Sequence, residues 1–189
     1  MDVGMLDCQV AILENAISRF FAENKVPGAI GLRHPSITPF AGLRAAADEY
    51  LILAAGNDGM FQKLCELLER DDLASDPRFA SNHLRTENHE ALYAELEFTL
   101  GGKPVATWLE ILNQGGIPCG PINNVEQVVN DPHVVDRNMI VSATSEKGAE
   151  FRMPGNPVKM SGYEDPATRK AAPALDQDRT AILDFINAD

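Results

Sequence analysis

The chain has 189 residues, a length that suits one large domain or two small ones. Hydrophobic residues make up 44% of it and charged residues 23%, which excludes a disordered or fibrous protein. The formal net charge of −12 argues against a nucleic-acid or anionic-membrane surface, because both targets are polyanions. We therefore expect an acidic globular protein that binds neither nucleic acid nor membrane.

Cysteine usage and the start of the chain bear on the cellular compartment. The three cysteines are widely spaced and form no Cys-x-x-Cys pair, so neither a disulfide framework nor a metal site is predicted. No apolar run approaches the roughly 20 residues that span a bilayer. Asp2 begins an acidic segment, unlike a signal peptide. We expect reduced thiols and a cytoplasmic protein.

The first predicted element is a helix from Asp2 to about Phe21, whose apolar residues recur at helical spacing on one face. An exposed face of that kind drives self-association, so we expect a homodimer. After loop signals, the run "YLILAAG" over residues 50–56 predicts a short buried strand. The turn over 56–59 leads into a helix through Arg70, with Asp58 placed to cap its first turn.

Glycine and proline mark the later boundaries. A helix is predicted over 82–100, ended by two glycines, and another over 104–114. The stretch "IPCGPI" over 117–122 predicts an extended connector, because its prolines lack backbone donors. Beyond it the sequence predicts a helix over 124–130, paired strands over 140–143 and 151–153 around Lys147-Gly148, and a last helix over 178–187.

Five strings occur in a fixed order: "DVGMLDCQVAIL", "HPSITPF", "AAGNDGMFQKLCELLERDDLASDPRFASNHLRTENHEAL", "LNQGGIPCGPINNVEQVVNDPHVVDRNMI" and "MPGNPVKMSG". Together they resemble the class III CoA-transferases, the family of formyl-CoA transferase, carnitine CoA-transferase and the bile-acid-inducible enzymes, with α-methylacyl-CoA racemase as a relative. The resemblance covers nearly the whole chain and corresponds to the C-terminal half of a family subunit. One departure is Asp48-Glu49, where the family has Asp-Gly in a tight turn.

The resemblance implies an α/β fold that is mostly helical. It implies a small α/β domain with linkers, together with C-terminal edge elements of a Rossmann-like large domain. Residues 1–45 would be an N-terminal helix and linker of the large domain, 46–120 the small α/β domain, and 121–189 the return linker and C-terminal elements of the large domain. Family subunits are threaded through each other like links, which agrees with a homodimer.

The implied activity is transfer of CoA between an acyl-CoA and a carboxylic acid. An aspartate of the family attacks the thioester and passes through a mixed anhydride and an aspartyl-CoA thioester. That aspartate corresponds to a position upstream of the first helix, so we assign no nucleophile here and expect the chain to be inactive without an N-terminal half-subunit. CoA or acyl-CoA would be a substrate of the complete enzyme, with no tightly bound cofactor and no metal.

Two alternatives stay open: a non-catalytic stand-alone or truncated domain, and part of an acyl-CoA racemase. The resemblance also marks three candidate site residues, each with a plainer alternative. Asp58 matches a turn whose carboxylate approaches the active site in the racemase branch, but it could simply cap a helix. His34 matches an active-site-facing loop and could transfer protons, or be a surface histidine. Met5 matches a position close to bound CoA, or packs in the core.

Two arginines flank the string "DPRFASNHLR". We expect Arg78 and Arg85 to anchor loops to helix carboxylates.

Overall fold

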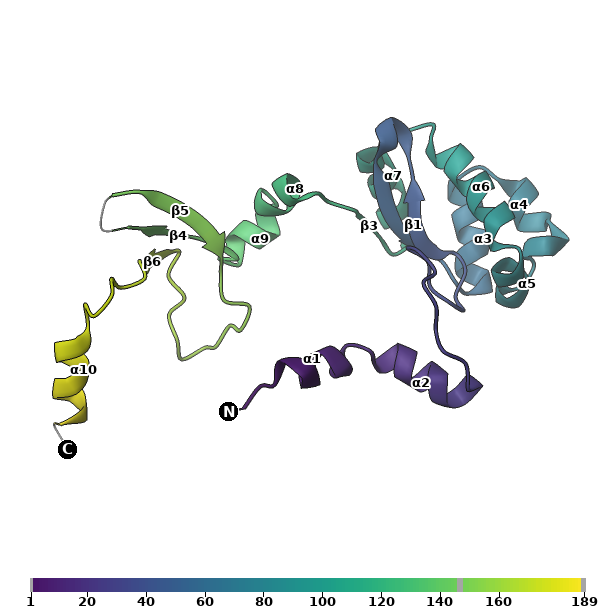
Figure 1. Ribbon diagram of the computed structural model, residues 1–189. Coiled ribbons are helices and arrows are strands. Elements are labelled where there is room, and N and C mark those ends of the chain that lie inside the picture. The colour runs from purple at the N-terminus through teal and green to yellow at the C-terminus, as the bar shows by residue number, and fades with distance from the viewer. Residues whose placement is uncertain (1, 146–147, 188–189) are drawn as a thin grey trace. The chain divides into compact units, whose positions relative to one another are not determined.

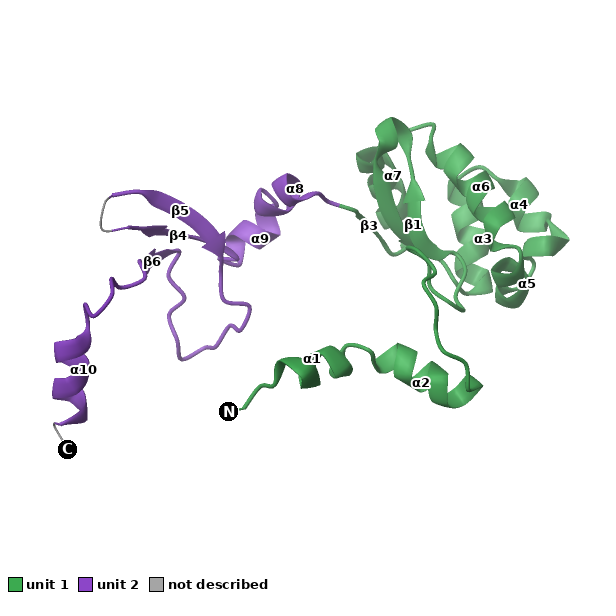
Figure 2. Cartoon of the chain, in the orientation of Figure 1, with its two compact units in different colours: residues 1–122 green, residues 123–189 purple. Residues whose placement is uncertain are grey.

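The computed structural model describes residues 2–145 and 148–187. The chain divides into two compact units, residues 1–122 and 123–189 (Figure 2). Each unit holds its own three-stranded sheet, and the fold is a mixture of helices and strands (Figure 1). Among the described residues, no helix has the length and apolar character needed to cross a bilayer.

The chain begins with two short helices, α1 (Met5–Ala11) and α2 (Glu14–Glu23). The sequence predicted one helix through Phe21, and this prediction was wrong at Leu13. The amide of Leu13 donates to the carbonyl of Val10 at 3.1 Å, an i→i−3 bond that interrupts the α-helical ladder. No residue of either helix is buried.

Sheet A of the first unit consists of β1 (Phe40–Arg44), β2 (Tyr50–Ala54) and β3 (Cys119–Pro121) in the order β1-β2-β3. Both pairs are antiparallel, with Ala41 opposite Leu53 and Leu53 opposite Cys119. Alternate residues of β1 and β2 are buried, as expected for a sheet that covers a core on one face. The sequence predicted β2; it assigned no strand to β1 and only an extended connector to β3.

A strained turn joins β1 to β2. Ala47 and Asp48 both have φ of +56°, and the amide of Glu49 donates to the carbonyl of Ala46 at 3.2 Å. This is the arrangement of a type I′ turn, in which Asn-Gly is the favoured pair because both central residues need positive φ. The tight turn is therefore present although neither central residue is glycine.

Helices and 3-10 turns fill the rest of the first unit: α3 (Asp58–Leu67), α4 (Asp71–Ser75), η2 (Pro77–Phe79), α5 (Asn82–Glu87), α6 (His89–Leu100) and α7 (Val105–Gln114). Their apolar faces meet the sheet in one core that includes Leu53, Phe61, Leu96 and Trp108. The predicted helix over 82–100 is two helices, divided at Asn88. The Asn88 side chain donates to the Leu84 carbonyl at 2.8 Å and so competes with the helical ladder.

The second unit contains α8 (Val125–Val129), α9 (Pro132–Asp136), β4 (Ile140–Thr144), β5 (Glu150–Pro154), β6 (Thr168–Lys170) and α10 (Arg179–Ile186). Asn124 and Gln127 form a reciprocal capping box that starts α8. In sheet B, β4 lies between β5, antiparallel to it, and β6, parallel to it. The predicted pair of strands is confirmed, whereas Lys147 of the turn expected between them lies outside the described residues.

Candidate functional site

A pocket of about 650 Å³ opens in the first unit where the loop before β1 meets the start of α3. Its walls are Ile37, Phe40, Ala54, Gly56, Asn57, Asp58, Met60, Asn82 and Pro118. Most of this lining is apolar, and Asp58 is its one charged side chain. An apolar cavity with few convergent polar groups is the usual form of a small-molecule site.

The turn before α3 places Asp58 at the pocket. Asn57 is the N-cap of α3, because its side-chain oxygen accepts from the amide of Met60 at 2.8 Å. The prediction that Asp58 caps this helix was therefore wrong by one residue. Asp58 instead lies in the first helical turn with its side chain 63% exposed, where a carboxylate also opposes the positive end of the helix dipole.

Arg85 fixes the carboxylate of Asp58. Its guanidinium is fully buried and donates from Nη2 to Oδ1 of Asp58 at 2.8 Å. The same guanidinium donates to three backbone carbonyls, those of Thr38, Gly56 and Phe79, at 2.7, 3.0 and 3.0 Å. The expectation that Arg85 anchors loops to a helix carboxylate is confirmed. Arg78 makes the more local contact, to Asp76 at 2.7 Å.

Asn82 was not predicted as a site residue, yet it holds the pocket together. Its side chain donates to the carbonyl of Ser36 at 2.8 Å and accepts from the amide of Thr38 at 2.9 Å. Its own backbone amide donates to Oδ1 of Asp58 at 3.1 Å. Oδ1 of Asp58 therefore accepts both this bond and the one from Arg85. Oδ2 of Asp58 accepts no hydrogen bond from the described residues. No sequence pattern indicates partners so distant along the chain.

His34 lies beside the pocket, half-buried, with its ring stacked on that of Phe40 at 5.4 Å between centroids. Its Nδ1 accepts from the amides of Ser36 and Ile37 at 3.2 and 3.1 Å. An Nδ1 that accepts hydrogen bonds carries no proton, so the neutral ring holds its proton on Nε2. The loop therefore presents His34 as a hydrogen-bond donor, with the lone pair of Nδ1 already engaged.

Met5 lies apart from these groups in the sequence, on α1, and the residue is 88% exposed. Met5 thus packs in no core formed by the described residues. A long, polarisable apolar side chain at the surface is suited to contact with a ligand or a second protein surface.

The structure brings no metal-ligand set together: within residues 2–145 and 148–187, no group of three His, Cys, Asp or Glu side chains is placed to hold an ion. The thiols are free, and burial raises the pKa of Cys119, which keeps this residue of β3 protonated at neutral pH.

Comparison with known proteins shows the family to which the chain belongs. Residues 1–179 match the family described as CoA-transferase family III. An acetyl-CoA:oxalate CoA-transferase of Acetobacter aceti is 41% identical over 182 residues, which are 96% of this chain and 45% of that enzyme. A succinyl-CoA:mesaconate CoA-transferase of Haloarcula marismortui is 32% identical over 100% of this chain and 47% of that enzyme. The chain belongs to CoA-transferase family III.

Comparison with solved structures supports the same family membership. A crystal structure of a CAIB/BAIF family protein from Brucella suis superposes with a TM-score of 0.76 at 33% identity, over 96% of this chain and 46% of that one. The chain thus spans about half the length of the curated relatives and of the solved structure that it matches. This coverage agrees with the C-terminal half that the sequence motifs indicated.

Proposed function

We propose that this chain acts as the C-terminal portion of an enzyme that transfers CoA between an acyl-CoA and a carboxylic acid. The observation that carries the proposal is the match to CoA-transferase family III, with transferases of oxalate and mesaconate among the relatives. The nucleophilic aspartate would come from an N-terminal half-subunit. In the complete enzyme, residues 1–45 and 121–189 would belong to the large domain and 46–120 to the small one, although the pairing of β1 with β2 moves the first boundary to a point before Phe40.

Asp58, His34 and Met5 are the residues that we assign to the active site. The mainly apolar pocket would surround the acyl end of the thioester, with the free oxygen of Asp58 at its rim. The Nε2–H of His34 would donate to a carbonyl or phosphate oxygen of acyl-CoA, and Met5 would contact the CoA chain. Arg85 holds the carboxylate of Asp58 in position, and therefore supports the site without touching substrate.

Complementation tests this proposal. The chain is mixed with the N-terminal half of the Acetobacter aceti transferase, and CoA transfer from acetyl-CoA to oxalate is followed by chromatography. We expect activity from the mixture and none from either part. Asp58→Asn should lower kcat of the mixture. Ser81→Ala, which removes the side-chain cap of α5 outside the pocket lining, should act on stability instead. A mixture that forms a complex and transfers no CoA would overturn the proposal.

One observation favours the racemase alternative: a solvent-accessible carboxyl group at an apolar pocket is suited to proton transfer. The same mixture, incubated with a 2-methylacyl-CoA in deuterium oxide, separates the two activities. Deuterium at the α-carbon without change of the acyl group would identify a racemase, and acyl exchange without deuterium would identify a transferase.

We further propose that the protein is cytoplasmic and forms a homodimer. The exposed apolar side chains of α1 and α2, among them Leu6 and Phe21, support self-association. Size-exclusion chromatography with light scattering measures the mass directly. A monomer at micromolar concentration would contradict the dimer.

A further inference from the structure

One short helix, α5, holds the loop that carries His34. Three of its side chains, those of Asn82, Arg85 and Thr86, lie at the spacing of one helical face and contact the same stretch of that loop. Arg85 donates to the carbonyl of Thr38 at 2.7 Å, and the hydroxyls of Thr86 and Thr38 lie 3.0 Å apart. The hydrogen bonds of Asn82 reach further, because they continue through the loop to the imidazole of His34.

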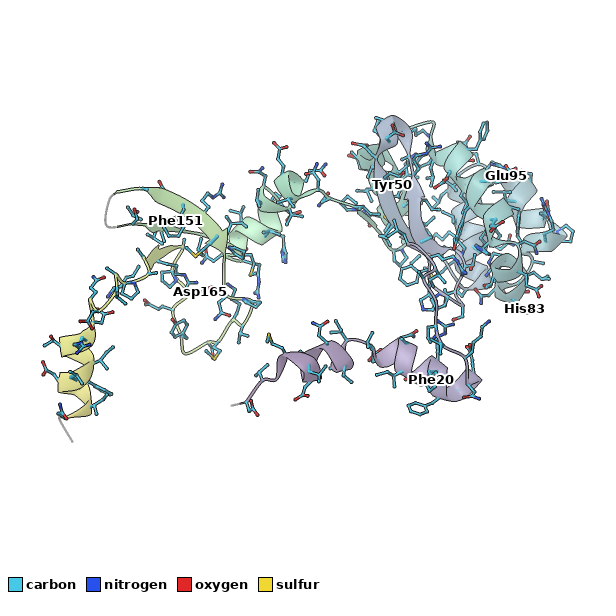
Figure 3. The ribbon with its side chains drawn as sticks, in the orientation of Figure 1. Phe20, Tyr50, His83, Glu95, Phe151 and Asp165 are labelled. Atoms are coloured by element: carbon cyan, nitrogen blue, oxygen red, sulfur yellow. The ribbon has the colours of Figure 1, made fainter. Side chains whose placement is uncertain are left out.

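The side chain of Asn82 uses both ends of its amide group. Its Nδ2 donates to the carbonyl of Ser36 at 2.8 Å, and its Oδ1 accepts from the amide of Thr38 at 2.9 Å. An amide side chain donates to one backbone group and accepts from another, which neither a carboxylate nor an aliphatic side chain does. The next residue, His83, instead has an exposed side chain (Figure 3). Asn82 is therefore the residue at the start of α5 whose side chain contacts the loop.

The bond from Asn82 to Ser36 is linked to His34 by a single peptide group. The carbonyl of Ser36 and the amide of Ile37 belong to that planar group, whose C=O and N–H point in opposite directions because the bond is trans. The carbonyl accepts from Nδ2 of Asn82, and the amide donates to Nδ1 of His34 at 3.1 Å. Successive hydrogen bonds of this kind polarise one another. The donor on Asn82 thus helps to fix the direction of the N–H that meets the imidazole.

The backbone of Asn82 contacts the other candidate group of the site. Its amide donates to Oδ1 of Asp58 at 3.1 Å. One residue therefore contacts the loop of His34 with its side chain and the carboxylate of Asp58 with its main chain. Substitution of the Asn82 side chain separates the two contacts, because the backbone amide remains in every variant except proline.

We propose that Asn82 is a positioning residue of the active site. Through the peptide group of Ser36 and Ile37 it holds His34 with Nδ1 occupied and Nε2–H directed to substrate. The inference rests on the proposed function only for the acyl-CoA that His34 would meet, since the link from Asn82 to His34 lies within this chain. Without the Asn82 donor the peptide group would turn, and Nδ1 would lose the amide of Ile37.

The first experiment uses the whole chain with Asn82→Asp and Asn82→Ala. An ionised Asp keeps an acceptor for Thr38 but has no donor for Ser36, and Ala has neither. Amide hydrogen exchange of Ile37 and the ring ¹⁵N resonances of His34 are measured at about pH 8, where histidines are in general neutral. Because Ile37 is exposed, both variants should accelerate exchange of its amide by about tenfold or more. The Nδ1 resonance should move toward that of a protonated ring nitrogen.

Asn88 supplies a matched control on the same helix. Its Nδ2 also donates to a backbone carbonyl, that of Leu84 at 2.8 Å, but at the other end of α5. Asn88→Asp therefore removes the same kind of donor without altering the bonds to the loop. The amide of Ile117, a buried residue of the same unit, reports general opening. In Asn88→Asp the amides of Ile37 and Ile117 should accelerate by similar factors.

Two results would overturn the proposal. The first is an unchanged Ile37 exchange rate together with an unchanged Nδ1 resonance of His34 in Asn82→Asp and Asn82→Ala. The second is acceleration of Ile37 by no more than that of Ile117 in these variants, which would mean that Asn82 only stabilises the unit. If one Asn82 variant does not fold, the other gives the same comparison, and Asn82→Ser replaces both if neither folds.

Kinetics of the mixture with the N-terminal half then relate this positioning to activity. Asn82→Ala and His34→Gln should each lower kcat, and the double variant should lower it no further than His34→Gln alone, because Asn82 acts through His34. Losses that multiply in the double variant would contradict that coupling. An inactive mixture would overturn the proposed function, whereas the exchange rates and ring resonances of the chain alone still decide whether Asn82 positions His34.

Discussion

Arg85 and Asp58 are joined by a 2.8 Å ion pair whose two members lie in opposite environments, because the guanidinium is fully buried and the carboxylate is 63% exposed. The buried member depends on its partners far more than the exposed member does. The ring of Phe61, 4.6 Å from the guanidinium carbon, adds a cation–π contact on the core side.

Replacing Arg85 by Met should therefore lower the free energy of unfolding of the first unit by about 3 kcal/mol or more, because several acceptors lose a buried donor at once. The loss includes three carbonyls that would be left without donors. Asp58→Asn removes the countercharge of the buried guanidinium but keeps an oxygen that can accept from Arg85 and from the amide of Asn82, so it should lose less, about 1 to 2 kcal/mol. Trp108, the single tryptophan and buried in this unit, reports unfolding by fluorescence in urea. Equal losses from the two variants would contradict this asymmetry.

The turn between β1 and β2 should tolerate, and gain from, a glycine. Asp48 holds φ at +56°, so Asp48→Gly removes strain and should raise the free energy of unfolding by about 0.5 to 1 kcal/mol. Asp48→Ala is the control, because it removes the carboxylate and leaves the positive φ of a side-chain-bearing residue. The same tryptophan fluorescence measures both. If Asp48→Ala raised the free energy of unfolding as much as Asp48→Gly, the gain would come from removal of the Asp48 charge and not from relief of backbone strain.

Gly155, at the end of β5, should not accept a side chain. A Cβ built there would lie 2.0 Å from the carbonyl oxygen of Asn138, a backbone atom that cannot swing away. We expect Gly155→Ala to destabilise the second unit by about 2 kcal/mol or more. Gly162→Ala in the same unit meets nothing within 4 Å and should be neutral. Hydrogen exchange of the Ala143 amide measures the effect, and unchanged exchange in Gly155→Ala would contradict it.

Alkaline pH should weaken the first unit through one thiol. Burial, and next the nearby charge of Asp72, raise the pKa of Cys65 from about 9 to about 11. Between these values the unfolded thiol has lost its proton and the folded one has kept it, so stability falls as pH rises, by up to about 1.4 kcal/mol per pH unit. Cys65→Ala should remove this part of the slope in urea titrations at a series of pH values. An identical slope in the variant would exclude the thiol as its cause.

The sequence predicted those helices and strands whose conformation is determined by residues next to them in the chain. β2 was predicted because a short apolar run is bounded by turn residues, and α8 because Asn124 begins a capping sequence. β1 was missed because Gly42 and Arg44 leave too little apolar alternation, and its pairing with β2 decides its conformation. Similarly, the middle of "IPCGPI" forms strand β3, which its prolines permit because β3 lies at the edge of the sheet.

The candidate site was predictable only in part. The resemblance marked Asp58, and the position of Arg85 in the string "DPRFASNHLR" suggested an anchoring role, but their contact joins residues from different helices. The role of Asn82 depends on a loop more than forty positions earlier, at Ser36 and Thr38. Side-chain hydrogen bonds over such separations follow from tertiary packing, for which a single sequence carries no periodic signal.

The third strand of sheet A has a consequence for how the first unit assembles. Leu53 pairs with Cys119, and every helix from α3 to α7 lies between these two residues in the chain. The β1–β2 hairpin closes a loop of a few residues, whereas the β2–β3 ladder closes a loop that contains most of the unit. Because closing a long loop costs more conformational entropy, the hairpin should form early and β3 should join last, after the intervening helices have shortened the distance it must span.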